Sequence, residues 1–144
     1  MKVAATKRFV LDASVTLAWC FADEATTYTE AVLDLLANGA EAVAPAIWPF
    51  EVANAVLTGE RRKRITLAQV APILQRIADL QIFVDPIRVD RAFGPTLLLA
   101  RKEQLTEYDA AYLELALREG LPLATLDDRL RRAARTAGIA LVRT

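Results

Sequence analysis

Short apolar runs alternate with longer segments of helical periodicity along this chain. Residues 9–11 form one such run, which ends at Asp12, and residues 82–84 form another. Continuous runs of this kind are typical of strands that are buried on both faces of a sheet. Helical segments of ten or more residues separate most of the runs, and connections of that length join parallel strands. We therefore expect an α/β fold: a three-layer α/β/α sandwich with a mainly parallel central sheet.

Capping and turn residues predict where the elements begin and end. Ser14 is expected to cap the first helix, Thr66 and Gln69 form a capping-box pattern, and Gly120 follows a helix that Thr106 is expected to cap. The predicted helices cover residues 14–21, 27–37, 49–57, 66–80, 89–102 with an interruption at Gly94-Pro95, 106–119 and 128–137. The predicted strands cover residues 9–11, 42–44, 82–84, 121–125 and 139–142.

Length and composition indicate one folded unit. The chain has 144 residues, of which 54% are hydrophobic, and its net charge is zero. Disorder is unexpected for such a composition, and one core commonly serves a chain of this length. No segment has the composition of a linker, so we expect a single domain over residues 1–144.

The chain contains no histidine and one cysteine, Cys20. The absence of histidine excludes Ser-His-Asp and Cys-His nucleophile systems as well as histidine-based zinc sites. A lone cysteine excludes an intramolecular disulfide framework. No apolar run approaches the ~20 residues that a membrane span requires, and the N-terminus lacks signal-peptide features. We expect a soluble cytoplasmic protein without a membrane partner, and no role is assigned to residues 1–7.

Four acidic residues occupy positions that suggest a site. Asp12 and Asp127 follow predicted strands, and ligands bind at the carboxyl ends of the strands in open parallel sheets. Glu51 and Asp109 lie on predicted helices among apolar residues. An ionised carboxylate beside a core is costly unless it is paired or bound to a metal. The four positions together therefore predict an acidic site.

A divalent cation would make such a cluster tolerable. Carboxylates that converge without a cation repel one another, and some would take up protons. Mg²⁺ and Mn²⁺ prefer oxygen ligands, and either ion can activate water without a histidine. The pattern favours metal-assisted phosphodiester hydrolysis over acyl transfer. Zinc fits poorly, because its protein sites usually draw on Cys or His.

Each acid also has a structural interpretation. Asp12 is placed to cap the helix that follows it, and Asp109 is placed for a capping box with Thr106. Asp127 and Asp128 both precede a basic helix that either could cap. Glu51 could be solvated at the edge of an amphipathic helix.

Arginines on the last predicted helix are candidates for contact with a phosphate backbone. Arg129 and Arg132 follow Asp127 closely, so we expect them to bind a nucleic-acid backbone near the acidic site. The alternative is a solvated helix face or ion pairs with nearby acids. A second cluster at residues 61–64 is a weaker candidate. Trp48 and Tyr112 are expected to be structural.

Four stretches carry a family resemblance that spans most of the chain. They are Val-Leu-Asp-Ala-Ser at 10–14, Pro-Ala-Ile-Trp at 45–48 with Glu-Val-Ala-Asn at 51–54, Leu-Thr-Glu-Tyr-Asp-Ala-Ala-Tyr-Leu-Glu-Leu-Ala at 105–116, and Leu-Ala-Thr-Leu-Asp at 123–127. The chain resembles PIN-domain ribonucleases, specifically the VapC toxins of type II toxin–antitoxin pairs. The stretches occur in the order that the family shows, and the third is the most specific.

The resemblance implies a PIN-like sandwich with an acidic pocket that binds Mg²⁺ or Mn²⁺. By position, Asp12 and Asp109 match the principal metal ligands and catalytic acids. Glu51 resembles the third acid and Asp127 the fourth, acting directly or through water, although Asp128 is adjacent to Asp127. The supporting hydroxyls of the family fall on two further residues, Ser14 and Thr125.

The resemblance also implies an endoribonuclease that assembles as a homodimer, cleaves RNA and is inhibited by a cognate VapB-type antitoxin. One alternative is a PIN-type nuclease of RNA processing or DNA metabolism. Another is a catalytically silent module that binds nucleic acid or a partner, which the presence of all four acids disfavours. A phosphoacceptor receiver domain would require a late lysine, and none follows Lys102.

Overall fold

A four-stranded parallel sheet forms the centre of the protein, described here by a computed structural model over residues 6–144. Residues 1–5 belong to the N-terminal segment without an assigned role and lie outside the described residues. The strands are β1 (Arg8–Leu11), β2 (Glu41–Ala44), β3 (Ile82–Val84) and β4 (Leu123–Ala124). Their order is β3-β2-β1-β4, and all three pairs of neighbours are parallel.

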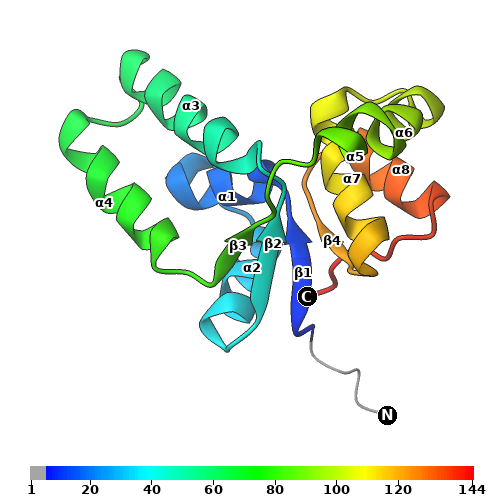
Figure 1. Ribbon diagram of the computed structural model, residues 1–144. Helices are drawn as coiled ribbons and strands as arrows, with labels where there is room; N and C mark the ends of the chain where they lie inside the picture. The colour runs from blue at the N-terminus through cyan, green and yellow to red at the C-terminus, as the bar shows by residue number, and fades with distance from the viewer. Residues whose placement is uncertain (1–5) are drawn as a thin grey trace, which may run out of the picture.

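Helices cover both sides of this sheet (Figure 1). One side carries α1 (Ala13–Cys20), the short 3₁₀ helix η1 (Ala22–Glu24), α2 (Thr27–Ala37), α3 (Trp48–Arg61) and α4 (Leu67–Ala78). The other side carries α5 (Val89–Phe93), α6 (Pro95–Glu103), α7 (Glu107–Glu119) and α8 (Asp128–Thr136). The predicted α/β/α sandwich with a mainly parallel central sheet is confirmed.

The central strand β1 explains the most apolar run of the sequence. Phe9, Val10 and Leu11 have no exposed surface, because β2 and β4 flank the strand and helices pack above and below it. Val10 pairs with Val43 of β2 and with Leu123 of β4. The carboxyl end of β1 therefore lies between those of β2 and β4, and the residue that follows it is Asp12.

The last predicted strand, over residues 139–142, is wrong. Leu141 forms only an isolated parallel bridge with Leu123, so the segment adds no full strand to the sheet. The predicted strand at 121–125 is also shorter in the structure and covers Leu123–Ala124 alone. The chain leaves the sheet at Thr125, whose hydroxyl is used by the acidic site rather than by solvent.

Most helix ends agree with the predicted caps. Thr106 accepts a hydrogen bond from Asp109 N at 3.1 Å, Gln69 Oε1 accepts from Thr66 N at 2.8 Å, and Gly120 ends α7 with a φ of +64°. Ser14 is the exception. Asp12 occupies the N-cap position of α1, and Ser14 lies inside the first turn, where its hydroxyl donates to Asp12.

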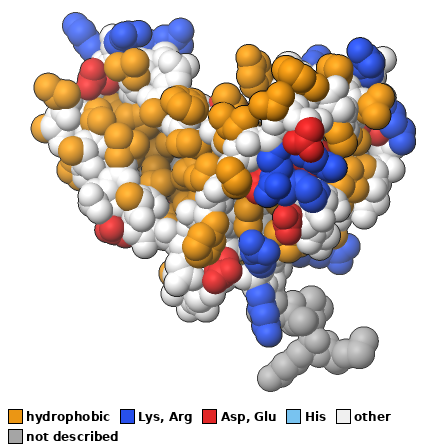
Figure 2. Space-filling model, in the orientation of Figure 1, with side chains coloured by type: hydrophobic (Ala, Val, Ile, Leu, Met, Phe, Trp, Pro, Cys, Tyr) orange, Lys and Arg blue, Asp and Glu red, His pale blue; other side chains and the backbone are white. Residues whose placement is uncertain are grey.

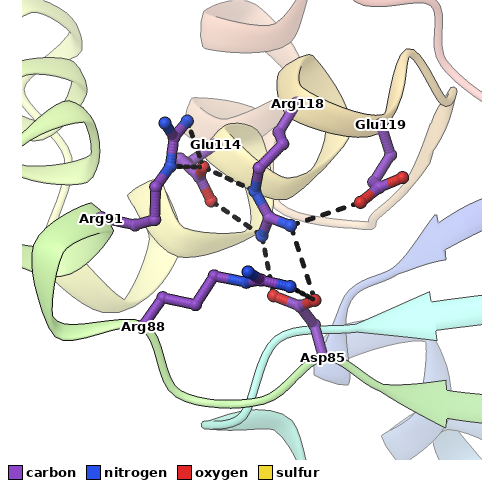
Figure 3. A network of polar contacts seen from close by, with 6 residues as sticks. All are labelled: Asp85, Arg88, Arg91, Glu114, Arg118 and Glu119. Carbon is purple, nitrogen blue, oxygen red and sulfur yellow. Dashed lines mark hydrogen bonds and ion pairs between the residues drawn. The ribbon is translucent and has the colours of Figure 1, made fainter.

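An ion-pair network connects α5 and the residue that follows β3 to α7 (Figure 3). Glu114 is only 5% exposed and accepts hydrogen bonds from Arg91 Nε at 2.7 Å and from Arg118 Nε at 2.9 Å. Arg118 also donates from Nη2 to Asp85 Oδ2 at 2.7 Å. The network joins the segment that follows β3 to the helix that carries Asp109.

No helix within residues 6–144 is both long enough and apolar enough to cross a membrane.

Candidate functional site

The first site residue, Asp12, lies where β1 ends and α1 begins. Its carboxylate is 5% exposed, and although the residue occupies the N-cap position, the side chain makes no capping hydrogen bond. Helix capping therefore does not account for this buried acid. A buried carboxylate needs hydrogen-bond donors or a cation to balance its charge.

Two hydroxyl groups supply the hydrogen bonds. Ser14 Oγ donates to Asp12 Oδ2 at 2.6 Å, and Thr125 Oγ1 donates to the same oxygen at 2.7 Å. Backbone amides fix the direction of both donors, because Leu126 N donates to Ser14 Oγ and Asp127 N donates to Thr125 Oγ1, each at 3.0 Å. Each hydroxyl has a single proton, which these contacts direct toward the carboxylate.

This arrangement leaves one side of the Asp12 carboxylate for another partner. Within the described residues, both hydrogen bonds to the Asp12 carboxylate end on Oδ2, and none reaches Oδ1. Burial raises the pKa of Asp12, and the negative charges of Asp109 and Asp127 raise it further, against the lowering effect of the Ser14 and Thr125 hydroxyls. The site therefore disfavours the charged form of its own central acid when no cation is present.

Glu51 reaches the site from the first turn of α3. Pro49 lies in that turn, as predicted, and Trp48 Nε1 donates to Thr16 Oγ1 at 3.0 Å, which anchors the turn to α1. Tyr112 OH donates to Glu51 Oε1 at 2.6 Å. Burial is the main cause of the raised pKa of Glu51, and the charges of Asp12 and Asp109 add to it.

Asp109 lies in the first turn of α7, where its backbone N–H is capped by Thr106. Burial raises the pKa of its carboxyl group first, and the charge of Asp127 raises it further. The Thr106 hydroxyl and the positive charge of Arg129 act in the opposite direction. This half-buried acid is therefore in electrostatic contact with both the acidic site and the basic helix.

Asp127 caps α8 by accepting a hydrogen bond from Leu130 N at 2.8 Å. Its structural interpretation is thus correct, yet its charge also raises the pKa values of Asp12 and Asp109. The adjacent Asp128 is not among the groups that shift either pKa. The charge of Asp127, unlike that of Asp128, therefore acts on the acidic site.

The four acids lie at the carboxyl end of the sheet, but their side chains do not form a complete metal site by themselves. Within the described residues, no three acidic, cysteine or histidine side chains are close enough together to hold a metal ion. The charge of Asp109 raises the pKa of Asp12, and the charges of Asp12 and Asp109 both raise the pKa of Glu51. The donor set consists of carboxylate oxygens, which suits a hard cation that retains several waters. The residues fit Mg²⁺ or Mn²⁺ held by one or two carboxylates.

The basic residues of α8 begin close to the acids, because the charge of Arg129 lowers the pKa of Asp109. Arg129 and Arg132 are exposed and line a polar pocket of about 330 Å³ between α6 and α8. Arg131 is used structurally, because its Nε donates to Thr125 O at 2.8 Å. In the other cluster, Arg64 contacts Asp23 and Glu24 at 3.0 Å and is not available to a phosphate.

The sequence analysis missed the role of Tyr112. This side chain was expected to be structural, and it is indeed wholly buried, but its hydroxyl also holds Glu51. Burial and the charges of Asp12 and Glu51 keep its pKa far above the ordinary value, so the phenol remains a donor. One signal was available: Tyr112 is three residues after Asp109, a spacing that places both on one face of a helix.

An apolar pocket of about 260 Å³ opens beside the acids, between α3, α5 and α7. Phe50 and Ile87 line it and are 70% and 75% exposed, and Phe93 of α5 is 78% exposed. Figure 2 shows apolar side chains gathered across this face next to a compact group of basic and acidic side chains. Arg91 and Glu107 lie at the pocket, and Glu107 Oε1 is buried without a partner among the described residues. Exposed apolar patches with polar rims are typical of protein contacts.

Comparison with known families gives one match, to the PIN domain, over residues 9–136. A search of curated protein sequences finds no match. The matched range contains Asp12, Glu51, Asp109 and Asp127.

Solved structures share the fold at low sequence identity. A protein from Pyrobaculum aerophilum is 22% identical, with a TM-score of 0.66, and the match covers 90% of this chain and 87% of that one. VapBC2 from Rickettsia felis, bound to a DNA fragment from its promoter, is 14% identical, with a TM-score of 0.66 and coverage of 94% and 97%. VapC20 from Mycobacterium tuberculosis, a sarcin-ricin loop cleaving toxin, is 15% identical, with a TM-score of 0.65 and coverage of 94% and 99%. Identities this low establish a common fold.

Proposed function

Because the chain belongs to the PIN-domain family, we propose that it is a metal-dependent endoribonuclease that acts as the toxin of a type II toxin–antitoxin pair. Membership in this family of nucleases supports a hydrolase that acts on nucleic acids. The observation that carries the proposal is the buried Asp12 carboxylate, whose hydroxyl donors share one oxygen and leave the other for a cation. The likeness to a toxin that cleaves an RNA loop supports RNA as the substrate class.

The four acids have distinct parts in this proposal. Asp12 and Asp109 are the residues that would bind a Mg²⁺ or Mn²⁺ ion. Glu51 and Asp127 would contact that ion directly or through a bound water. The ion supplies positive charge that polarises a phosphodiester and makes water more acidic. Ser14 and Thr125 keep Asp12 in place, and no histidine is required. The products of in-line attack are 5′-phosphate and 3′-hydroxyl ends.

The first test is cleavage of RNA by the purified chain. We expect endonucleolytic cuts with Mg²⁺ or Mn²⁺ and none with excess chelator, and sequencing of RNA 5′ ends after induced expression should identify the target. Cleavage of DNA in preference to RNA would favour the alternative nuclease role. RNA binding without cleavage under any divalent ion would favour the silent binding module and contradict the proposal.

Arg129 and Arg132 provide the contact with the RNA backbone in this proposal. The charge of Arg129 acts on Asp109, so the basic face begins at the acids. Replacing Arg132 with Gln should weaken RNA binding and reduce the slope of log affinity against log salt by about 0.7–1, the amount lost with one phosphate contact. Fluorescence anisotropy in chelator, which blocks cleavage, measures both quantities. Arg76→Gln, at an exposed arginine of α4 outside both basic clusters, is the control, and an equal slope change in both variants would reject the assignment.

Protein partners complete the proposal. We propose a cytoplasmic homodimer that a cognate VapB-type antitoxin inhibits. The similarity to VapBC2 and to FitAcB from Neisseria gonorrhoeae supports an antitoxin partner. The exposed apolar patch that includes Phe50, Ile87 and Phe93 supports a second copy of the chain, because the patch carries both arginine and glutamate side chains and can complement itself. The mass of the purified chain in light scattering tests the homodimer.

A further inference from the structure

One hydrogen bond connects the two helices that bring Glu51 and Asp109 to the site. Tyr112 OH of α7 donates to Glu51 Oε1 of α3 at 2.6 Å, across 61 residues of sequence. It is a short bond with a charged acceptor, the class of hydrogen bond that is strongest in proteins. The bond links helices from the two sides of the sheet, because α3 and α7 lie on opposite sides of it (Figure 1).

Packing fixes the donor of this bond, whereas the acceptor depends on the bond itself for its position. Tyr112 is fully buried, so packing fixes its ring and therefore the position of its hydroxyl group. A glutamate side chain that is only half-buried would otherwise sample several rotamers. Since one oxygen of Glu51 is held by the phenol, the carboxylate has a defined position next to Asp12 and Asp109.

We propose that Tyr112 is a positioning residue, which holds the Glu51 carboxylate where it can accept a hydrogen bond from a water molecule on a divalent cation bound by Asp12 and Asp109. This inference rests on the proposed function, because it assumes the ion. Partners behind the ligands are known to orient them and to set metal affinity. Core packing alone would explain the buried ring, but it would not require a hydroxyl group aimed at Glu51.

The test compares Tyr112→Phe with the parent in Mn²⁺ binding without RNA, followed by titration calorimetry or the spin-resonance signal of free Mn²⁺. The substitution keeps the ring and removes only the hydroxyl. We expect Mn²⁺ affinity to fall about tenfold, the lower end of the range for the loss of such partners. In cleavage assays, kcat should fall more than KM changes. Trp19→Phe, which removes the indole donor to Thr29 O in α2, should keep the parent's Mn²⁺ affinity.

A double-mutant cycle separates positioning from packing. In a Glu51→Ala background, Tyr112→Phe should change Mn²⁺ affinity no further, because the acceptor has already been removed. Equal losses in both backgrounds, or an affinity within twofold of the parent for Tyr112→Phe alone, would overturn the inference. If Tyr112→Phe fails to fold, Glu51→Asp tests the bond, because the shorter side chain keeps the carboxylate but withdraws it from the phenol; Mn²⁺ affinity equal to that of the parent would then overturn the inference.

Failure of the proposed function has a different signature. If the parent chain binds no Mn²⁺, or if Asp12→Asn leaves its Mn²⁺ affinity unchanged, both the proposed ion site and this inference are wrong. A parent that binds Mn²⁺ through Asp12 but not through the Tyr112–Glu51 pair leaves the proposed function standing and rejects Tyr112 alone.

Discussion

Replacement of Asp12 by Asn should lower RNA cleavage by about 10³-fold or more and leave the metal-free protein at least as stable as the parent. The loss of activity follows because Asn keeps the shape of the side chain but not the charge that binds a divalent ion, whose effect on a phosphoryl transition state amounts to several kcal/mol. The amide oxygen still accepts the hydrogen bonds of Ser14 and Thr125, so the local structure has no reason to change.

The stability half of this prediction follows from the raised pKa of Asp12. Burial and the charges of Asp109 and Asp127 raise this pKa above its ordinary value of 3.8, so the folded state binds protons more tightly than the unfolded state. The free energy of unfolding of the metal-free parent therefore falls as pH rises from about 3.8 through the raised pKa. The amide introduced by Asp12→Asn does not titrate, so the free energy of unfolding of the variant does not fall with pH for this reason.

Urea unfolding in chelator, followed from about pH 4 upward, measures the effect, and labelled RNA measures cleavage. The advantage of Asp12→Asn over the parent should grow as pH rises from about 3.8 through the raised pKa of Asp12 and then stay constant. Asp34→Asn, an exposed acid on α2, makes the same chemical change away from the site and should alter neither property. A variant that cleaves like the parent with excess metal would refute the catalytic assignment, and one that fails to fold would show that Asp12 is a structural residue.

Local sequence signals predict most of the helices and strands of the fold. The three consecutive apolar residues of β1 are fully buried, and Thr106 and Gly120 bound α7 as their types predict. These features depend on neighbours along the chain, and capping and strand burial are local or periodic properties. Apart from the strand expected at residues 139–142, element types therefore followed from pattern alone, as did the choice of candidate acids.

Contacts between distant residues account for what the sequence did not predict. Thr125 is 113 residues from the Asp12 oxygen to which it donates, and Tyr112 is 61 residues from Glu51. The family resemblance, and not the local pattern, implied that the Ser14 and Thr125 hydroxyls support the acidic site. Ser14 was also expected to cap the first helix, but it lies inside the first turn of α1 and donates to Asp12. Periodicity and spacing do not identify partners that are this far apart in the sequence.

Removal of Glu114 should cause the second large effect, a loss of about 3 kcal/mol in the free energy of unfolding. Glu114→Ala takes away the acceptor that Arg91 and Arg118 share and leaves the little-exposed Arg118 guanidinium with fewer partners. Breaking a buried ion pair from one side costs about 3–5 kcal/mol, and the lower end applies because Arg91 is partly exposed. Urea unfolding in chelator measures this loss without a contribution from metal binding.

Arg88→Ala is the matched control within the same network. Arg88 meets Asp85 at 3.5 Å, and its side chain is 47% exposed, so its removal should cost about 0.5 kcal/mol or less. Salt distinguishes the two pairs further, since it screens exposed charges more than buried ones. If Glu114→Ala and Arg88→Ala had equally small effects, the network would be a solvated surface feature. A loss confined to Glu114→Ala would instead identify Glu114 as the residue that fixes α5 and the end of β3 to α7, the helix from which Asp109 and Tyr112 reach the acidic site.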